Sequence, residues 1–258
     1  MTLTASPTHA SGSLRERVSP AEWETRIMLA ASYRLMAHAG IFDLANNHLS
    51  ARIPDRPDAY LVKGQGQFFD EVTASSLLAY DFHGERLYPS DDCVSPGGLV
   101  IHGGVMEARP DLMAVFHTHT PANIGVSAQA CGLLPISQHA VKFYNRIGYH
   151  EFGGFEFDLA GRERLIRDLE GKRTLIMRNH GVLCCGRSIQ EAYVSHHFLE
   201  VACRAQVAAL TAGGTTALVI PSPEVAEHAA RQSEKTDRTR DWPALMRLAD
   251  RIDPSFRD

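Results

Sequence analysis

Short strand-like runs lie between helices that begin with clear capping signals, and this mixture limits the folds open to the chain. The strand-like runs, each apolar or alternating in polarity, are 49–53, 59–62, 78–82, 112–116 and 175–177. Turn residues separate the first three, over 54–58 for example. Because strands and helices intermix without strict βαβ alternation, we predict a mixed α/β layer fold with helices packed against a sheet.

Two capping boxes mark the starts of the longest predicted helices. In Ser19-Pro20-Ala21-Glu22 and in Ser188-Ile189-Gln190-Glu191, a serine hydroxyl can accept a helix amide hydrogen while the glutamate returns to the serine amide. We expect these helices to end near Gly40 and Thr211. Further helices are predicted after Pro96-Gly97-Gly98, after Thr120, and over 224–231 and 242–251.

Neither a repeat nor a low-complexity linker divides the 258 residues, so we predict one domain over 20–215. Residues 1–19 are polar and are expected to form a flexible lead-in. Residues 216–258 are predicted to be a helical extension that packs on a neighbouring subunit or caps the active-site pocket.

Charge and cysteine content exclude several classes of protein. The chain has 26 Lys and Arg against 30 Asp and Glu, with no basic cluster of the kind that binds nucleic acid. No apolar run approaches the roughly 18 residues of a membrane span. The first twenty residues lack a signal-peptide core, and the five cysteines suit neither a disulfide framework nor a zinc ribbon. We therefore expect a cytoplasmic protein with no nucleic-acid or membrane partner.

His117 and His119 follow the predicted strand 112–116 directly. Residues two apart in an extended segment point to the same side, so these two imidazoles can chelate one metal ion. His180, after the strand 175–177, is a third candidate at that sheet edge. With 13 histidines in the chain, an ordinary surface or core pair is an equally good interpretation of His117 and His119 alone. His180 alone is more typical of a hydrogen-bonded structural residue.

The remaining histidine pair has a poorer geometry for metal binding. His196 and His197 lie inside a predicted helix, where adjacent side chains diverge by about 100°. They are interpreted as structural or surface residues, as are His38, His83 and His150.

Several segments, in this order, resemble the class II aldolase and adducin family. They are Asn47-His48-Leu49-Ser50-Ala51-Arg52, the stretch 69–77, Ile101-His102, 108–111, the segment 114–120 around the histidine pair, and 178–183 around His180. The resemblance covers about residues 20–215. It implies a three-layer α/β/α fold with a central, mainly antiparallel sheet. It also implies one divalent ion (Zn, Mn or Fe) held by His117, His119 and His180, and a homotetramer.

The chain departs from the sugar-phosphate aldolases of that family. Their catalytic Glu lies in a Ser-Ser-Glu run that aligns here with Pro96-Gly97-Gly98, so the carboxylate position falls on Gly98. Their Thr-Pro-x-Gly phosphate turn becomes Lys63-Gly64-Gln65-Gly66. These differences favour a substrate without phosphate.

Other groups are then needed to bind the substrate and handle protons. We predict His139 and Lys63 as catalytic residues, His139 protonating a carbanion and Lys63 orienting a carboxylate. A solvated lysine is an equal alternative for Lys63, and core packing is the more common fate of a residue such as Tyr144. The predicted substrate-binding residues are Asn47, Lys63, Gly64, Gly97 and Tyr144.

The leading functional hypothesis is a metal-dependent carbon–carbon lyase. It would be a decarboxylase or aldolase acting on a small, non-phosphorylated oxo- or hydroxy-carboxylate. A non-haem iron oxygenase is the main alternative, and a dehydratase or epimerase is a further one. A non-catalytic adducin-like binding module is the third class, against which the three histidines argue.

Overall fold

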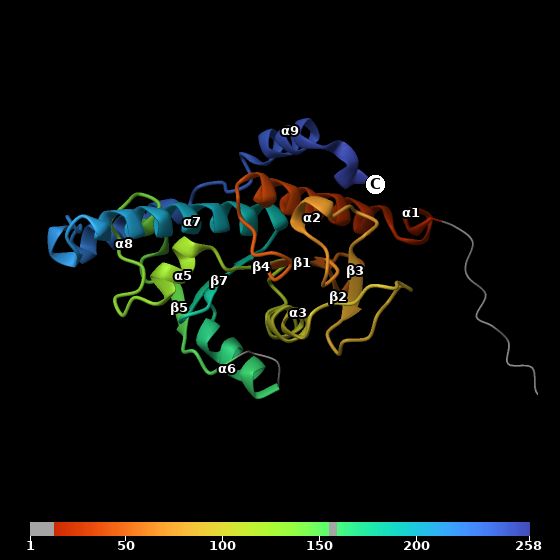
Figure 1. Ribbon diagram of the computed structural model, residues 1–258, viewed down its shortest axis with the longest axis horizontal. Helices are drawn as coiled ribbons and strands as arrows, with labels where there is room; N and C mark the ends of the chain where they lie inside the picture. The colour runs from red at the N-terminus through yellow and green to blue at the C-terminus, as the bar shows by residue number, and fades with distance from the viewer. Residues whose placement is uncertain (1–12, 155–158) are drawn as a thin grey trace, which may run out of the picture.

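A seven-stranded sheet forms the centre of the computed structural model, which describes residues 13–154 and 159–258 (Figure 1). The strand order is β3-β2-β1-β4-β7-β6-β5, and neighbouring strands are antiparallel except β5 and β6. The strands are β1 (His48–Ile53), β2 (Arg56–Val62), β3 (Leu78–Asp81), β4 (Ala114–Thr118), β5 (Ile147–His150), β6 (Thr174–Met177) and β7 (Gly181–Gly186). The predicted mainly antiparallel sheet is confirmed.

Helices cover both faces of this sheet and complete the predicted three layers (Figure 1). One layer contains α2 (Pro20–His38), α5 (Pro121–Ser127) and α7 (Ile189–Thr211). The other contains α3 (Pro96–Gly98), the π-helical segment η2 (Leu99–Gly103), α4 (Gly104–Ala108) and α6 (Leu159–Leu169). Alternate strand residues enter the two cores: Phe116 packs on the α2 and α7 side, and Val115 packs on the α4 and α6 side.

Serine caps start the two long helices as predicted, but the glutamates of both motifs bind elsewhere. The hydroxyls of Ser19 and Ser188 accept the amide hydrogens of Glu22 and Glu191. The Glu22 carboxylate pairs with Arg26, and Glu191 pairs with Arg173 and accepts the amide of Arg187. The helices therefore start where a single hydroxyl satisfies one free amide.

Two strands and one longer helix, β5, β7 and α6, were not predicted, nor were the short helices of one turn. The turn expected over 54–58 is confined to Pro54 and Asp55, and β2 begins at Arg56. The helix predicted after Pro96-Gly97-Gly98 is present but already begins at Pro96, and the π-helical segment η2 lies in its middle. These differences change local boundaries and leave the layer arrangement unaffected.

The C-terminal stretch packs on its own chain. It contains η4 (Thr215–Ala217), α8 (Pro223–Glu234), α9 (Trp242–Ile252) and η5 (Pro254–Arg257), and α9 lies over α2 (Figure 1). Phe256 is fully buried, and Asp253 pairs with Arg34 of α2 at 2.8 Å. This stretch therefore completes the core on the outer side of α2.

At the other end, residues 1–12 of the predicted lead-in lie outside the described part of the chain. The rest of the lead-in contains the one-turn helix α1 (Leu14–Arg17). The short helices η1 (Phe69–Glu71) and η3 (Ala140–Phe143) complete the fold. No helix within residues 13–154 and 159–258 combines the length and apolarity that a bilayer crossing requires.

Candidate metal centre

The three histidines predicted as metal ligands lie together at one end of β4 and β7. His117 is in β4, His119 follows that strand, and His180 precedes β7. Because β4 pairs antiparallel with β7, with Thr118 opposite Val182, the end of one strand meets the start of the other. The Nε2 atom of His119 lies 2.8 Å from Nε2 of His117 and 3.1 Å from Nε2 of His180.

Hydrogen bonds fix the orientation of two of these imidazoles. Nδ1 of His117 lies 3.0 Å from the carbonyl oxygen of Val182, and Nδ1 of His119 lies 3.2 Å from Oδ2 of Asp43. Both partners accept hydrogen bonds, so each Nδ1 carries the proton and each Nε2 presents a lone pair. Two such lone pairs at 2.8 Å repel one another, and a cation bound by both nitrogens removes that repulsion.

The two spacings from Nε2 of His119, 2.8 and 3.1 Å, are close to those in a metal site, and the ligand atoms of all three histidines lie within 4.8 Å of one another. Zn–N bonds are about 2.0–2.1 Å long, so three nitrogens on one face of the coordination sphere lie roughly 3.0–3.4 Å apart. Burial, with the neighbouring imidazoles, lowers the pKa of His117 well below its ordinary value. Burial also lowers the pKa of His119, although Asp43 opposes this effect. The neutral imidazole is the form that binds a metal ion.

Two backbone features place His180 beside His119. A Cβ atom on Gly181 would lie 2.4 Å from the carbonyl oxygen of Thr118, so only glycine permits this approach of the two strands. Asn179 has a φ of 56°, in the left-handed region that asparagine tolerates better than most residues. Asn179 and Gly181 therefore allow the backbone conformation that brings His180 to the site.

Behind His117 lies a chain of buried polar side chains that the sequence analysis did not assign to the site. His48 is the strand partner of His117, and their ring centroids are 5.1 Å apart. Nδ1 of His48 lies 2.6 Å from Nε2 of His102, whose Nδ1 contacts the Ser50 hydroxyl. Burial lowers the pKa of His102 to about 3, so this imidazole is neutral. The signal was present in the sequence, because His48, Ser50 and His102 all lie in segments that resemble the family.

The histidines open into a cavity of about 560 Å³. Its apolar wall is formed by Pro96, Ile101, Ile124 and Phe152. Polar side chains of Asn46, Gln65, Ser95 and Asn179 also line it, together with His48 and Asp43. Gly97, a predicted substrate-binding residue, is among the lining residues. Among the lining residues that the structure describes, Asp43 is the one with an acidic side chain.

Two predicted site residues support the cavity from behind. Oδ1 of Asn47 accepts the amide hydrogen of His119 at 2.9 Å, and Asn47 is fully buried. Nζ of Lys63 donates to the carbonyl oxygens of Ala45 (2.7 Å) and Gly64 (3.2 Å). Burial lowers the pKa of Lys63 to about 8. Neither side chain is among the described residues lining the cavity.

The other predicted residues lie apart from the cavity of the same chain. The ring of His139 packs against Phe198 of α7, with centroids 5.6 Å apart. The carbonyl of Tyr144 accepts a hydrogen bond from Arg146, and Gly64 packs so closely on Asp92 that a Cβ atom would collide with that carboxylate. Their roles in substrate binding and proton transfer stay predictions.

Comparison with known proteins gives a consistent result. The family model "Class II Aldolase and Adducin N-terminal domain" matches residues 28–207. A Caulobacter vibrioides protein whose name places it with the class 2 aldolases is 38% identical, over 95% of this chain and 96% of its own. Alpha-adducin of Rattus norvegicus is 37% identical, over 77% of this chain and 27% of its own length.

Solved structures agree with this result. The crystal structure of an aldolase II superfamily protein from Pseudomonas syringae has a TM-score of 0.91 and 44% identity, covering 96% of this chain and all of the other. L-fuculose 1-phosphate aldolase from Glaciozyma antarctica, at 20% identity, has a TM-score of 0.78 and covers 96% of this chain and 94% of its own. The similarity to the L-fuculose 1-phosphate aldolase shows a shared fold alone.

Proposed function

Because the chain belongs to the class II aldolase and adducin family, we propose that it is a metal-dependent carbon–carbon lyase, a decarboxylase or an aldolase. Its substrate is a small, non-phosphorylated oxo- or hydroxy-carboxylate. The observation that carries the proposal is the convergence of Nε2 atoms from His117, His119 and His180, two of them with their protons held on Nδ1. A divalent ion there (Zn, Mn or Fe) would act as a Lewis acid on a substrate oxygen.

The composition of the cavity supports a substrate without phosphate. None of the described lining residues is a lysine or arginine, and Nζ of Lys63 is already bound by two carbonyl oxygens. A phosphate group, with its larger charge, would therefore lack the cationic partner that such groups usually have, whereas a singly charged carboxylate would have the metal ion as its partner. The amides of Asn46, Gln65 and Asn179 suit hydroxyl or carbonyl oxygens, and the apolar wall suits a carbon skeleton.

His48 is our candidate for a substrate contact that this chain has instead of the carboxylate of the aldolases. It lines the cavity beside His117, and His102 holds it from behind through the 2.6 Å contact. At Gly98, a Cβ atom would lie 2.8 Å from the side chain of Val94, so the position is closely packed. We assign to His48 a hydrogen bond to a substrate oxygen.

His139 and Tyr144 fit this proposal through a neighbouring subunit. Both lie outside the cavity of their own chain, and the family resemblance implies a homotetramer whose active sites often lie at subunit interfaces. In such an assembly either residue would reach the cavity of a neighbour. Loss of activity in His139→Ala, with the metal content unchanged, would support this arrangement.

A non-catalytic binding domain is the second candidate function. It is favoured by the 37% identity to alpha-adducin over 202 residues, which exceeds the identity to the L-fuculose 1-phosphate aldolase. The two candidates differ in whether the chain turns over any carboxylate.

The test is an anaerobic assay of the metal-reconstituted protein against a panel of oxo- and hydroxy-carboxylates. Carbon dioxide and aldehyde release are measured for the wild type, His117→Ala and the control His83→Ala, which changes an exposed histidine in a turn. We expect activity in the wild type and control and its loss in His117→Ala. Activity that His117→Ala retains, or that appears only with oxygen, would contradict the lyase proposal.

A further inference from the structure

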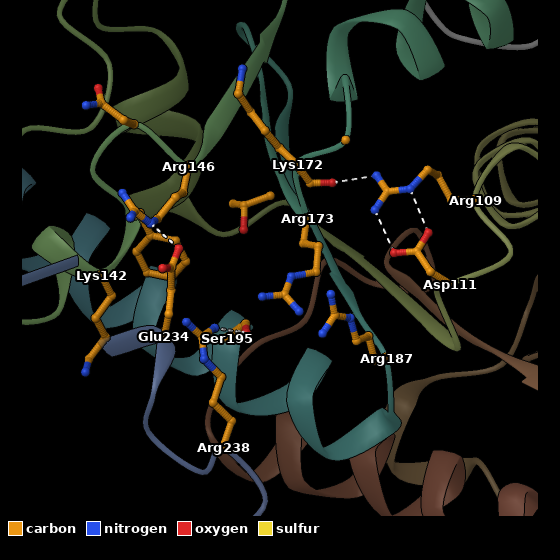
Figure 2. Close-up of a pocket in the computed structure, with 14 residues that line it drawn as sticks. Arg109, Asp111, Lys142, Arg146, Lys172, Arg173, Arg187, Ser195, Glu234 and Arg238 are labelled. Carbon is orange, nitrogen blue, oxygen red and sulfur yellow. Dashed lines mark hydrogen bonds and ion pairs between the residues drawn. The ribbon is translucent and has the colours of Figure 1, made fainter. Parts of the chain in front are cut away.

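A second cavity lies at the opposite ends of β4 and β7 from the three histidines, and it is strongly basic (Figure 2). Its volume is about 280 Å³. Arg109 and Asp111 precede β4, and Arg187 follows β7, at the ends where Ala114 pairs with Gly186. At about 3.3 Å per residue, β4 alone separates this cavity from the metal centre by roughly 13 Å. The two sites therefore lie at opposite ends of the same strands, and none of the described residues lines both of them.

Cationic side chains outnumber carboxylates in this cavity. Seven lysine or arginine residues line it, together with Asp111 and Glu234. Four of the seven have carboxylate partners, and these pairs are Arg109 with Asp111, Arg146 with Glu227 and Glu234, Arg173 with Glu191, and Lys172 with Glu170. For Lys142, Arg187 and Arg238, the described part of the chain provides no carboxylate within salt-bridge distance.

Arg238 is the most enclosed of these unpaired cations. It is partly buried, and its Nη1 donates to the hydroxyl of Ser195 at 2.6 Å, where Ser195 is itself buried in α7. Burial lowers the pKa of Arg238, the charge of Glu191 opposes this shift, and the charge of Arg173 acts in the same direction as burial. A guanidinium has five N–H donors, so most of its hydrogen-bonding capacity is available to a ligand.

Three separate segments bring arginines to the same space. Figure 2 shows Arg173, Arg187 and Arg238 around one opening, and they come from the α6–β6 connection, the β7–α7 connection and the α8–α9 connection. The backbone at Arg187 is fixed, because its amide donates to Oε2 of Glu191 at 2.8 Å. This arrangement differs from a solvated helix face, where like charges can turn away from one another.

We propose that this basic cavity, defined by Arg173, Arg187 and Arg238, binds a small multivalent oxyanion of the phosphate or polycarboxylate class. Guanidinium groups match such oxyanions through pairs of parallel N–H···O bonds. Arg173 already pairs with Glu191. A multivalent anion would offset the charges of Arg187 and Arg238 and supply the acceptors that Arg238 lacks. The proposal is independent of the lyase activity, since the three histidines take no part in it.

The test is titration calorimetry with two probes, pyrophosphate and citrate, at constant ionic strength and with metal removed. The variants are Arg187→Gln and Arg238→Gln, with Arg247→Gln as a control because Arg247 is an exposed arginine on α9 outside the cavity. We expect one site per chain in the wild type and control, and affinity weaker by about tenfold or more in both cavity variants. Binding of one probe only would support the proposal and identify the class of anion.

Three results would overturn the proposal. The first is that neither probe binds the wild type at millimolar concentration. The second is that Arg187→Gln binds as the wild type does, and because Arg187 is exposed, this variant tests the site without a change in the core. The third is that His117→Ala abolishes binding, which would place the anion at the three histidines.

Discussion

At the scale of single residues, metal binding depends on which nitrogen of each histidine ring carries the proton. The carbonyl of Val182 and the carboxylate of Asp43 hold protons on the Nδ1 atoms of His117 and His119, and this leaves their Nε2 atoms for a ligand. The alternation of an extended strand predicted that His117 and His119 share a side, and the end of the strand 175–177 made His180 a third candidate. The family resemblance then implied that all three bind one ion. Asp43 was not predicted, because it lies in an irregular segment whose position depends on how the chain returns to the sheet.

Replacing Asp43 tests this orientation. Asp43→Asn should weaken metal affinity by about tenfold to a hundredfold, the usual effect of losing a carboxylate that holds a metal-ligating histidine. The measurement is competition with a chelator of known affinity. Asp81→Asn, in β3 and outside the cavity, is the control, and equal affinities in the two variants would show that Asp43 does not orient His119.

Lys63 should make stability depend on pH. Burial lowers its folded-state pKa from 10.5 to about 8, so the folded state disfavours the charged amine. Between pH 8 and 10.5 the unfolded chain binds the proton and the folded chain does not, so this contribution to the free energy of unfolding rises with pH. The full rise is up to about 3 kcal/mol.

Denaturant titrations at pH 7 and 10 measure this effect. The increase in the free energy of unfolding should be larger in the wild type than in Lys63→Met, which cannot titrate. Equal changes in the two proteins would mean that the folded-state pKa of Lys63 is not depressed.

At the level of elements, the site depends on where β4, β7 and β1 meet. The sequence predicted β4 and β1 because their apolar residues are continuous or alternate. It did not predict β7, whose glycines at both ends are weak strand formers. Gly181 and Gly186 are needed for close approach to neighbouring backbone, so packing in the folded protein determines this strand more than local preference does.

Gly181→Ala tests that close approach. The new Cβ atom would lie 2.4 Å from the Thr118 carbonyl oxygen, so β4 and β7 must separate locally. We expect a loss of about 1–3 kcal/mol in the free energy of unfolding, together with weaker metal binding. Gly66→Ala is the control, because a Cβ atom there meets no atom within 4 Å. Similar stability and metal binding in both variants would argue against a constrained junction at Gly181.

For the whole molecule, the polarity patterns predicted helices packed against a sheet, and the family resemblance implied the three layers and the mainly antiparallel sheet. The place of the C-terminal stretch was not predictable from its own residues. Its amphipathic helices show that one face is buried, and the partner, α2, is more than 200 residues away in the chain, as the pair of Arg34 with Asp253 shows. The placement of His139 likewise depends on the path of the chain between β4 and β5.

Phe256→Ala tests whether the C-terminal stretch stabilises the core. Phe256 is fully buried against the α2 layer, so its loss should reduce the free energy of unfolding by about 3–5 kcal/mol. Val219→Ala, at a side chain that is 92% exposed, should change it by less than about 0.5 kcal/mol. A small effect of Phe256→Ala in thermal or urea unfolding would mean that this stretch is peripheral to folding.

The measurement that tests the central claim most directly is the metal content of the purified protein. Plasma mass spectrometry on the wild type, His117→Ala, His180→Ala and the control His83→Ala gives the number of ions per chain, and circular dichroism checks that each is folded. We predict close to one divalent ion per chain in the wild type and control, and none in the other two. A folded wild type that carries no ion and takes up none on reconstitution would contradict the three-histidine metal site.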